Sequence, residues 1–266
     1  MRPSPVNSRS ACVVVALCAS IASVALFESP ITAGAQRVRS GLPRTPDGKP
    51  DLQGIWQAHG RAEYDLTNHG VDGGTIPYQP WALAKRAENV AKRATLDPLS
   101  RCFMPGVPRI MYMSLPFQIF QTPNQVVMAF KWSQLFRQIY TDGSKAPEGI
   151  DFWMGDSRGH WESETLVVSV TNHNDKTWFD MAGNFHSDAM QIVERFTMAD
   201  ADTIRYEATI QDPKVFTRPW KISLPLAREK HLDRVLEYQC QAEIEEANGA
   251  FPREPRTWYP KSGDAR

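Results

Sequence analysis

Short strand-like segments follow one another through residues 117–241 with mostly tight turns between them, and this pattern constrains the fold more than any other feature. The clearest segment is Thr203–Ile210, whose apolar face carries Ile204, Tyr206, Ala208 and Ile210. Strands joined by tight turns pair antiparallel, and many strands in one domain usually close on themselves to remove free edges. The sequence therefore predicts an all-β, mainly antiparallel fold: an up-and-down barrel or a barrel-like sandwich of about 8–10 strands.

One helical insertion interrupts this pattern near residues 80–95. The segment is rich in Ala, Lys, Arg and Glu, and Pro80 suits a first helical turn. A strand at Leu52–Trp56 precedes the insertion, and the last predicted strand is Val235–Gln241. Because no linker separates them, we expect a single barrel-like domain over residues 51–246.

The N-terminus has the features of a cleavable secretory signal. A basic start and an apolar run over residues 11–27 precede the A-x-A cleavage signature that ends at Ala35. The run is shorter than the about 20 residues that span a bilayer. We expect a signal peptide over residues 1–35, cleaved after about Ala35, and a periplasmic or secreted protein; the alternative is an uncleaved anchor helix. Residues 36–50 are expected to form an extended polar arm, and residues 247–266 a loosely ordered tail.

The charge balance argues against partners that need a basic surface. The chain contains 30 basic residues (Lys and Arg) and 30 acidic residues (Asp and Glu), so its formal net charge is zero. Nucleic acids and membrane surfaces attract proteins with an excess of positive charge. We therefore expect no nucleic-acid partner and no membrane insertion after cleavage.

Cleavage would leave Cys102 and Cys240 as the cysteines of the mature chain. In an oxidising compartment two such cysteines are expected to form a disulfide between an early loop and the last strand. The alternative is two buried free thiols. The sequence contains no P-loop and no G-x-G-x-x-G motif, so we expect no organic cofactor.

Several segments resemble a large family of secreted bacterial proteins of unassigned function. They are Pro50–Trp56, Cys102–Arg109, Trp161–Val168, and His186–Asp188 leading to Glu194–Phe196. The resemblance implies export and a shared fold type, and it carries no catalytic residues. The Gly54-Ile55-Trp56 segment is also similar to the G-x-W start of lipocalin-type (calycin) barrels, from which the long insertion over residues 59–115 departs.

Reactive side chains are densest in residues 171–195, which should form a loop at one end of the sheet. A histidine beside a carboxylate is the minimum equipment for proton transfer near neutral pH. We expect His186 or His173 to act as general base or acid, oriented by Asp180 or Asp175. The structural alternative is that the aspartates cap turns and that His186 bonds to backbone in a buried loop.

A buried ion pair is predicted inside the barrel. Glu194 shares the inward face of its strand with Ile192 and Phe196, and a buried carboxylate needs a partner. Arg137 is the expected partner, either as a structural ion pair or as an anchor for a polar ligand group. Trp178 and Phe185, in the reactive loop, are the aromatic residues expected to contact a ligand.

His160, His173 and His186 recur at a constant interval, which makes a three-histidine metal site a minor alternative to chance spacing. No H-x-H, H-E-x-x-H or C-x-x-C motif supports such a site, so no metal is expected.

Three hypotheses for the function follow. The first is an exported, cofactor-free acid–base enzyme, that is a lyase, isomerase, hydratase or hydrolase, acting on a small apolar or aromatic molecule in a barrel pocket. The second is a non-catalytic periplasmic binding protein of calycin type that holds an apolar ligand. The third is a structural or envelope-interaction protein that uses its tail and the loop over residues 59–77.

Overall fold

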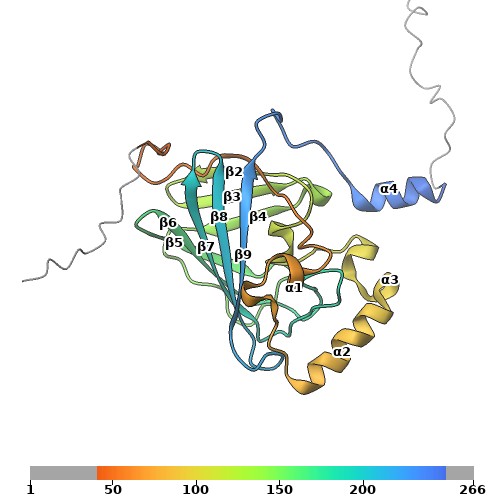
Figure 1. Ribbon diagram of the computed structural model, residues 1–266. Coiled ribbons are helices and arrows are strands. Elements are labelled where there is room, and N and C mark those ends of the chain that lie inside the picture. The colour runs from red at the N-terminus through yellow and green to blue at the C-terminus, as the bar shows by residue number, and fades with distance from the viewer. Residues whose placement is uncertain (1–40, 250–266) are drawn as a thin grey trace, which may run out of the picture. The chain divides into compact units, whose positions relative to one another are not determined.

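The computed structural model describes residues 41–249, and within them nine strands close into a barrel. The strands follow one another in chain order, and the last pairs with the first (Figure 1). They are β1 (Gly54–Ala58), β2 (Phe117–Thr122), β3 (Gln125–Phe130), β4 (Phe136–Tyr140), β5 (Asp156–Glu162), β6 (Thr165–Thr171), β7 (Gln191–Asp200), β8 (Thr203–Gln211) and β9 (Trp220–Arg228). The predicted all-β barrel is confirmed. The predicted signal peptide, the start of the arm and residues 250–266 of the tail lie outside the described residues.

The pairing of β4 with β5 departs from the expected up-and-down pattern. The other neighbouring strands are antiparallel, whereas these two run parallel and align over only two residue pairs, one of which joins Ile139 to Ser157. The connection over residues 141–155 returns along the barrel before β5 begins. Its opening Asp142-Gly143 resembled a tight turn in the sequence, and for that reason the crossover was not predicted.

Helices lie outside the barrel, mostly between β1 and β2. That connection contains α1 (Leu66–His69), α2 (Pro80–Ala91) and α3 (Arg93–Leu96), together with short 3₁₀ turns. The predicted helical insertion is confirmed, with Pro80 in the first turn of α2.

The predicted strand at Val235–Gln241 is wrong. The helix α4 (Cys240–Ala247) begins there instead. Because β9 already pairs with β8 on one side and with β1 on the other, the closed barrel has no free edge for another strand.

Trp56 and Arg228 pack together where the barrel closes. The guanidinium carbon of Arg228 lies 4.1 Å from the centre of the buried Trp56 ring, and its Nη1 donates to the Gln53 carbonyl at 2.8 Å. A Cβ at Gly54 would lie 2.1 Å from that Nη1. The G-x-W segment therefore has a local cause: the glycine leaves room for the guanidinium that covers the tryptophan ring.

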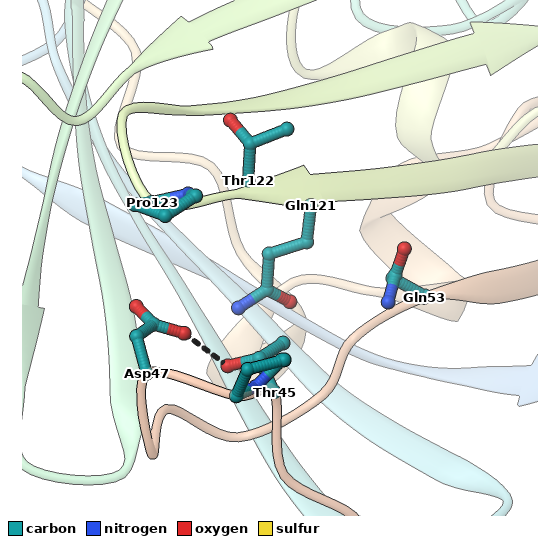
Figure 2. A pocket seen from close by; sticks show the side chains of 7 residues that line it. Thr45, Asp47, Gln53, Gln121, Thr122 and Pro123 are labelled. Carbon is teal, nitrogen blue, oxygen red and sulfur yellow. Dashed lines mark hydrogen bonds between the residues drawn. The ribbon is translucent and has the colours of Figure 1, made fainter.

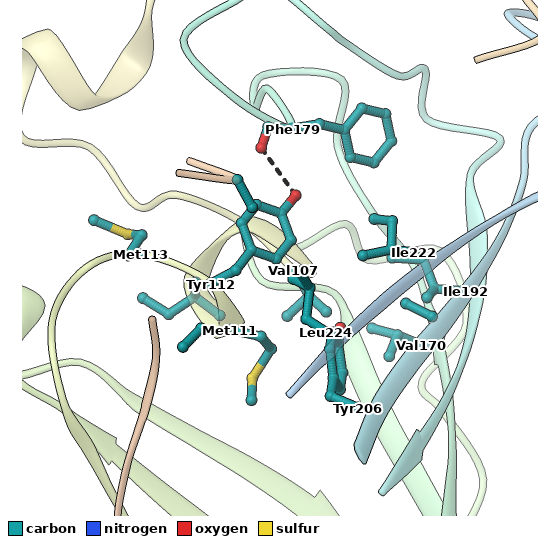
Figure 3. Close-up of a cluster of buried hydrophobic side chains, with 14 of the residues drawn as sticks. Val107, Met111, Tyr112, Met113, Val170, Phe179, Ile192, Tyr206, Ile222 and Leu224 are labelled. Atoms are coloured by element: carbon teal, nitrogen blue, oxygen red, sulfur yellow. Dashed lines mark hydrogen bonds between the residues drawn. The ribbon is translucent and has the colours of Figure 1, made fainter. Parts of the chain in front are cut away.

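Apolar side chains fill the barrel interior. On β8 the predicted inward face is buried throughout, as the two-residue period of a strand requires. Figure 3 shows that residues of the strands, such as Ile192 and Ile222, belong to one cluster with Met111 and Tyr112 of the β1–β2 connection. The core thus extends from the barrel into that connection.

The β1–β2 connection and the β6–β7 loop (residues 172–190) close the same end of the barrel, which we call the capped end. The Tyr112 hydroxyl donates to the Phe179 carbonyl at 2.9 Å, and the Met181 amide donates to the Glu63 carbonyl at 2.9 Å. These bonds join segments far apart in the sequence and hold the β6–β7 loop over the barrel.

Cys102 and Cys240 form the predicted disulfide, with Cα atoms 5.5 Å apart. It joins the β1–β2 connection to the start of α4, not to a strand as expected. All described residues belong to one compact unit. No helix within residues 41–249 is long and apolar enough to span a membrane.

Candidate functional site

The β6–β7 loop, where the sequence predicts the reactive residues, is folded inward. His173, Asp180 and His186 are buried, and Asp175 is exposed. Because burial separates these polar side chains from bulk water, they need hydrogen-bond partners within the protein.

His186 is held by backbone and by a hydroxyl group. Its Nδ1 lies 3.0 Å from the Ser187 carbonyl oxygen, so Nδ1 carries the proton, and Nε2 accepts from the Thr177 hydroxyl at 2.6 Å. Burial lowers the pKa of His186, and the charges of Asp212 and Asp175 oppose this only in part. The ring is therefore a neutral imidazole with both nitrogens occupied.

Asp180 binds backbone and amide groups, and no hydrogen bond joins it to His186 among residues 41–249. Oδ2 accepts from the Leu66 amide at 2.7 Å and from the Asn184 side chain at 2.6 Å, while Oδ1 accepts from the Ala182 amide at 3.0 Å. Burial raises the pKa of Asp180 above its usual value, and the hydrogen bonds from Leu66 and Asn184 oppose this only in part. The carboxylate thus fastens α1 to the β6–β7 loop.

Three residues near His186 were missed at the sequence level: Thr177, Ser187 and Asp212. The buried Asp212 accepts from the Ser187 amide at 2.6 Å and from the Ser187 hydroxyl at 2.9 Å. A connected path therefore runs from Asp212 through Ser187 and His186 to Thr177. The spacing of residues in the sequence could not reveal this path, because Asp212 comes from the β8–β9 connection. The one local signal was that Asp212 begins an Asp-Pro turn.

His173 is buried and unpaired. Neither ring nitrogen makes a hydrogen bond of good geometry within residues 41–249. The backbone of Val170 makes a weaker hydrogen-bonding contact with the ring, and this contact has the smallest influence on the pKa of His173. Its ring centre lies 5.8 Å from that of His186. Burial, with smaller effects of His186 and of the positive charge of Arg137, lowers the pKa of His173 to about 3. The ring is therefore neutral at ordinary pH.

Arg137 and Glu194 form the predicted ion pair in the barrel interior. Two guanidinium nitrogens contact the two carboxylate oxygens, one of them at 3.0 Å. Tyr206 donates its hydroxyl to Glu194 at 2.8 Å, and Ser157 accepts from Arg137 Nε at 3.1 Å. Burial, followed by the charge of Glu194, raises the pKa of Tyr206 well above its usual range, so it stays a donor.

The predicted ligand residues fall into two groups. The backbones of Trp178 and Phe185 form an isolated antiparallel β-bridge within the β6–β7 loop, and the Phe185 ring packs 6.0 Å from that of Trp81 on α2. No hydrogen bond or ring contact within residues 41–249 joins them to Arg137 or Glu194. The aromatic pair belongs to the cap, and the ion pair belongs to the barrel.

The three histidines at constant spacing do not meet. His160 is exposed on β5 and its Nε2 lies 3.2 Å from Glu162, whereas His173 and His186 are in ring contact. Over residues 41–249 no group of three or more His, Cys, Asp or Glu side chains could hold a metal ion.

A pocket of about 500 Å³ lies at the other end of the barrel, between the arm and the β2–β3 turn (Figure 2). It is lined by Thr45, Pro46, Asp47, Gln53, Gln121, Thr122 and Pro123. Gln121 is engaged by backbone, since Oε1 accepts from Leu52 and Nε2 donates to Pro50. This lining contains one carboxylate and no histidine, so it offers no acid–base pair.

No protein-family model matches the chain, and no curated protein matches it significantly. Its class is therefore defined by the structure: a closed β-barrel, capped at one end, with a buried ion pair inside and a buried histidine pair under the cap.

We expect Arg137→Met to destabilise the fold by about 3–5 kcal/mol, because it leaves the Glu194 carboxylate buried without its cation. Glu194→Leu should cost a similar amount, and the double variant should cost less than the sum of the two. The exposed pair between Arg44 and Glu164 is the control, and Arg44→Met should change stability by less than about 1 kcal/mol. Urea unfolding measures all four; additive losses would contradict a direct pairing.

The free energy of unfolding should decrease as the pH falls below about 6.5, the pKa of an unperturbed histidine. Both buried histidines have lowered pKa values, so the unfolded chain binds protons that the folded one does not. Each histidine should lower the free energy of unfolding by about 1.4 kcal/mol per pH unit as the pH falls. This continues until the pH reaches the pKa of that histidine in the folded protein, which is about 3 for His173. Urea unfolding between pH 5 and pH 7 should give a shallower slope for His173→Phe. A variant of the exposed His160, His160→Gln, should keep the original slope.

Proposed function

We propose that the protein binds a small, mainly apolar molecule at the capped end of the barrel through a hydrogen bond to His173. The observation that supports this most directly is the pair of buried ring nitrogens without a partner among residues 41–249. An unpaired buried polar group costs about 1–3 kcal/mol. A ligand that supplies the partner recovers this energy; an internal water is the competing occupant.

The state of the ring defines the ligand group. A neutral imidazole offers one donor and one acceptor, so a hydroxyl or a neutral carbonyl group matches it. Arg137 is already neutralised by Glu194, which disfavours an anionic ligand group. The ring of His186 lies next to His173 and itself packs against Phe179, and these rings favour an apolar or aromatic body for the ligand.

The compartment belongs to the same proposal. The disulfide between Cys102 and Cys240 is of the kind that persists in oxidising surroundings. Together with the signal-like N-terminus, it supports a protein that is exported and works in the periplasm or outside the cell.

Phenol and toluene test the role of His173, because they have similar shapes and differ in one hydroxyl. Phenol should bind more tightly by about a factor of ten, the worth of one hydrogen bond, and should move the ¹⁵N resonances of the ring. His173→Phe should remove that preference while toluene still binds. A preference that survives in the variant, or resonances that stay in place at saturation, would refute the proposal.

A second candidate is an acid–base enzyme of the hydrolase kind, and a specific observation favours it. The Thr177 hydroxyl lies 2.6 Å from Nε2 of the neutral His186, whose other nitrogen is oriented by the Ser187 carbonyl. This is the arrangement of a nucleophile beside its base. Nε2 would take the hydroxyl proton as Oγ1 attacks a carbonyl carbon, pass it to the leaving alkoxide, and water would release the acyl group.

Hydrolysis of p-nitrophenyl acetate tests this candidate. If Thr177 is the nucleophile, Thr177→Val should lower the rate above background by about 100-fold or more, because it removes the attacking oxygen. Thr177→Ser retains the hydroxyl and should keep most of the rate. Equal rates for the valine variant and the unaltered protein would eliminate the enzyme hypothesis and leave Thr177 as a structural partner of His186.

A further inference from the structure

The helix α2 turns apolar side chains to solvent. Trp81 and Leu83 are each 55% exposed and Val90 is 45% exposed, and Leu96 of the adjoining α3 is exposed as well. Figure 1 shows α2 and α3 on the outside of the barrel. Apolar residues on a surface helix normally face the core, so this helix has an unusual orientation.

The side of α2 that faces the protein buries the small Ala82 and the polar Asn89. Asn89 is buried, and its Nδ2 donates to the Gly183 carbonyl of the β6–β7 loop at 3.2 Å. Leu83 and Val90 are seven residues apart and therefore share a side of the helix, which the exposed alanines 84, 87 and 91 widen. The more apolar face of α2 is thus the one left open.

Positive charge surrounds this face, although the whole chain is neutral. Residues 80–101 contain five basic residues, Lys85, Arg86, Lys92, Arg93 and Arg101, and one exposed acid, Glu88. Lys85 and Lys92 both pair with Glu88, at 3.1 and 3.0 Å. The other acid, Asp97, is buried and neutralised by Arg109. A local excess of positive charge therefore borders the apolar face.

We propose that α2 and α3 dock on the surface of a bilayer that contains anionic phospholipids. Leu83 and Val90 enter the interfacial region, while the basic side chains reach the headgroups. Helices with Lys and Arg beside exposed apolar residues such as Leu bind in this way. The helix lies on the membrane and does not cross it, since its 12 residues extend only about 18 Å.

Charge selects lipid over a second copy of the chain. Two α2 faces packed together would oppose two clusters with the same excess of positive charge, which is unfavourable. An anionic surface is complementary to that excess, and each basic residue near it contributes a favourable energy. The inference rests on α2 and α3 alone and does not depend on what the barrel binds.

Vesicle flotation with the full chain tests the proposal, using vesicles of phosphatidylcholine alone and of phosphatidylcholine mixed equally with phosphatidylglycerol. The protein should float with the mixed vesicles, far less with the neutral ones, and less as salt increases. Equal flotation with both, or with neither, would overturn the proposal.

Two exposed apolar residues provide matched variants. Leu83→Glu should lower partitioning onto the mixed vesicles at least tenfold, whereas Phe136→Glu, on β4 at a residue 69% exposed, should leave it unchanged. Arg93→Gln should weaken partitioning about fivefold, the loss expected for one basic residue near an anionic surface. Equal effects of Leu83→Glu and Phe136→Glu would overturn the assignment to α2. So would a dimer, seen by sedimentation, that Leu83→Glu dissociates while no vesicle is bound.

Discussion

The buried ion pair between Arg137 and Glu194 is the contact on which the barrel interior depends. An unpaired charge there would be very costly, so β4 and β7 must keep the register that brings the two together. Ser157 extends the network across the short parallel ladder between β4 and β5, and Tyr206 extends it to β8. A shift of any of these strands by one residue would turn a polar group away from its partner.

At the capped end the buried polar side chains are also paired, but their partners are neutral groups. Asp180 accepts hydrogen bonds from backbone amides, and His186 bonds to a carbonyl and a hydroxyl group. These side chains therefore hold the β6–β7 loop against the β1–β2 connection. A high density of titratable residues therefore does not by itself indicate catalysis. His173 differs from them because the described residues leave its nitrogens unpaired, and the proposed binding function rests on that difference.

Predictions that follow from strand periodicity and residue type were largely confirmed, and these include two contacts between distant residues, the ion pair and the disulfide. The path of the chain after β4 and after β9, and the partners of the loop residues, were not predicted. The alternation of β8 and the shared inward face of Glu194 and Ile192 follow from the two-residue period, and Arg137 was the cation on a matching face. The parallel ladder of β5 and the helix at Cys240 were missed, because barrel closure decides which strand edges are free. The expected pairing of Asp180 with His186 was replaced by contacts with Leu66 and Thr177, which no local pattern could indicate.

The sequence by itself determined the strand faces, the position of α2, the barrel class and the chemistry of the residues in the β6–β7 loop, because periodicity and residue type act locally. The tertiary structure alone decided which polar groups meet at the capped end, where Asp180 and His186 are satisfied and His173 is left unpaired within the described residues. It also decided that the apolar face of α2 points outward beside a local excess of positive charge that the net charge of the chain averages away. Both outcomes depend on contacts between segments far apart in the chain, and those contacts form only when the barrel closes and is capped.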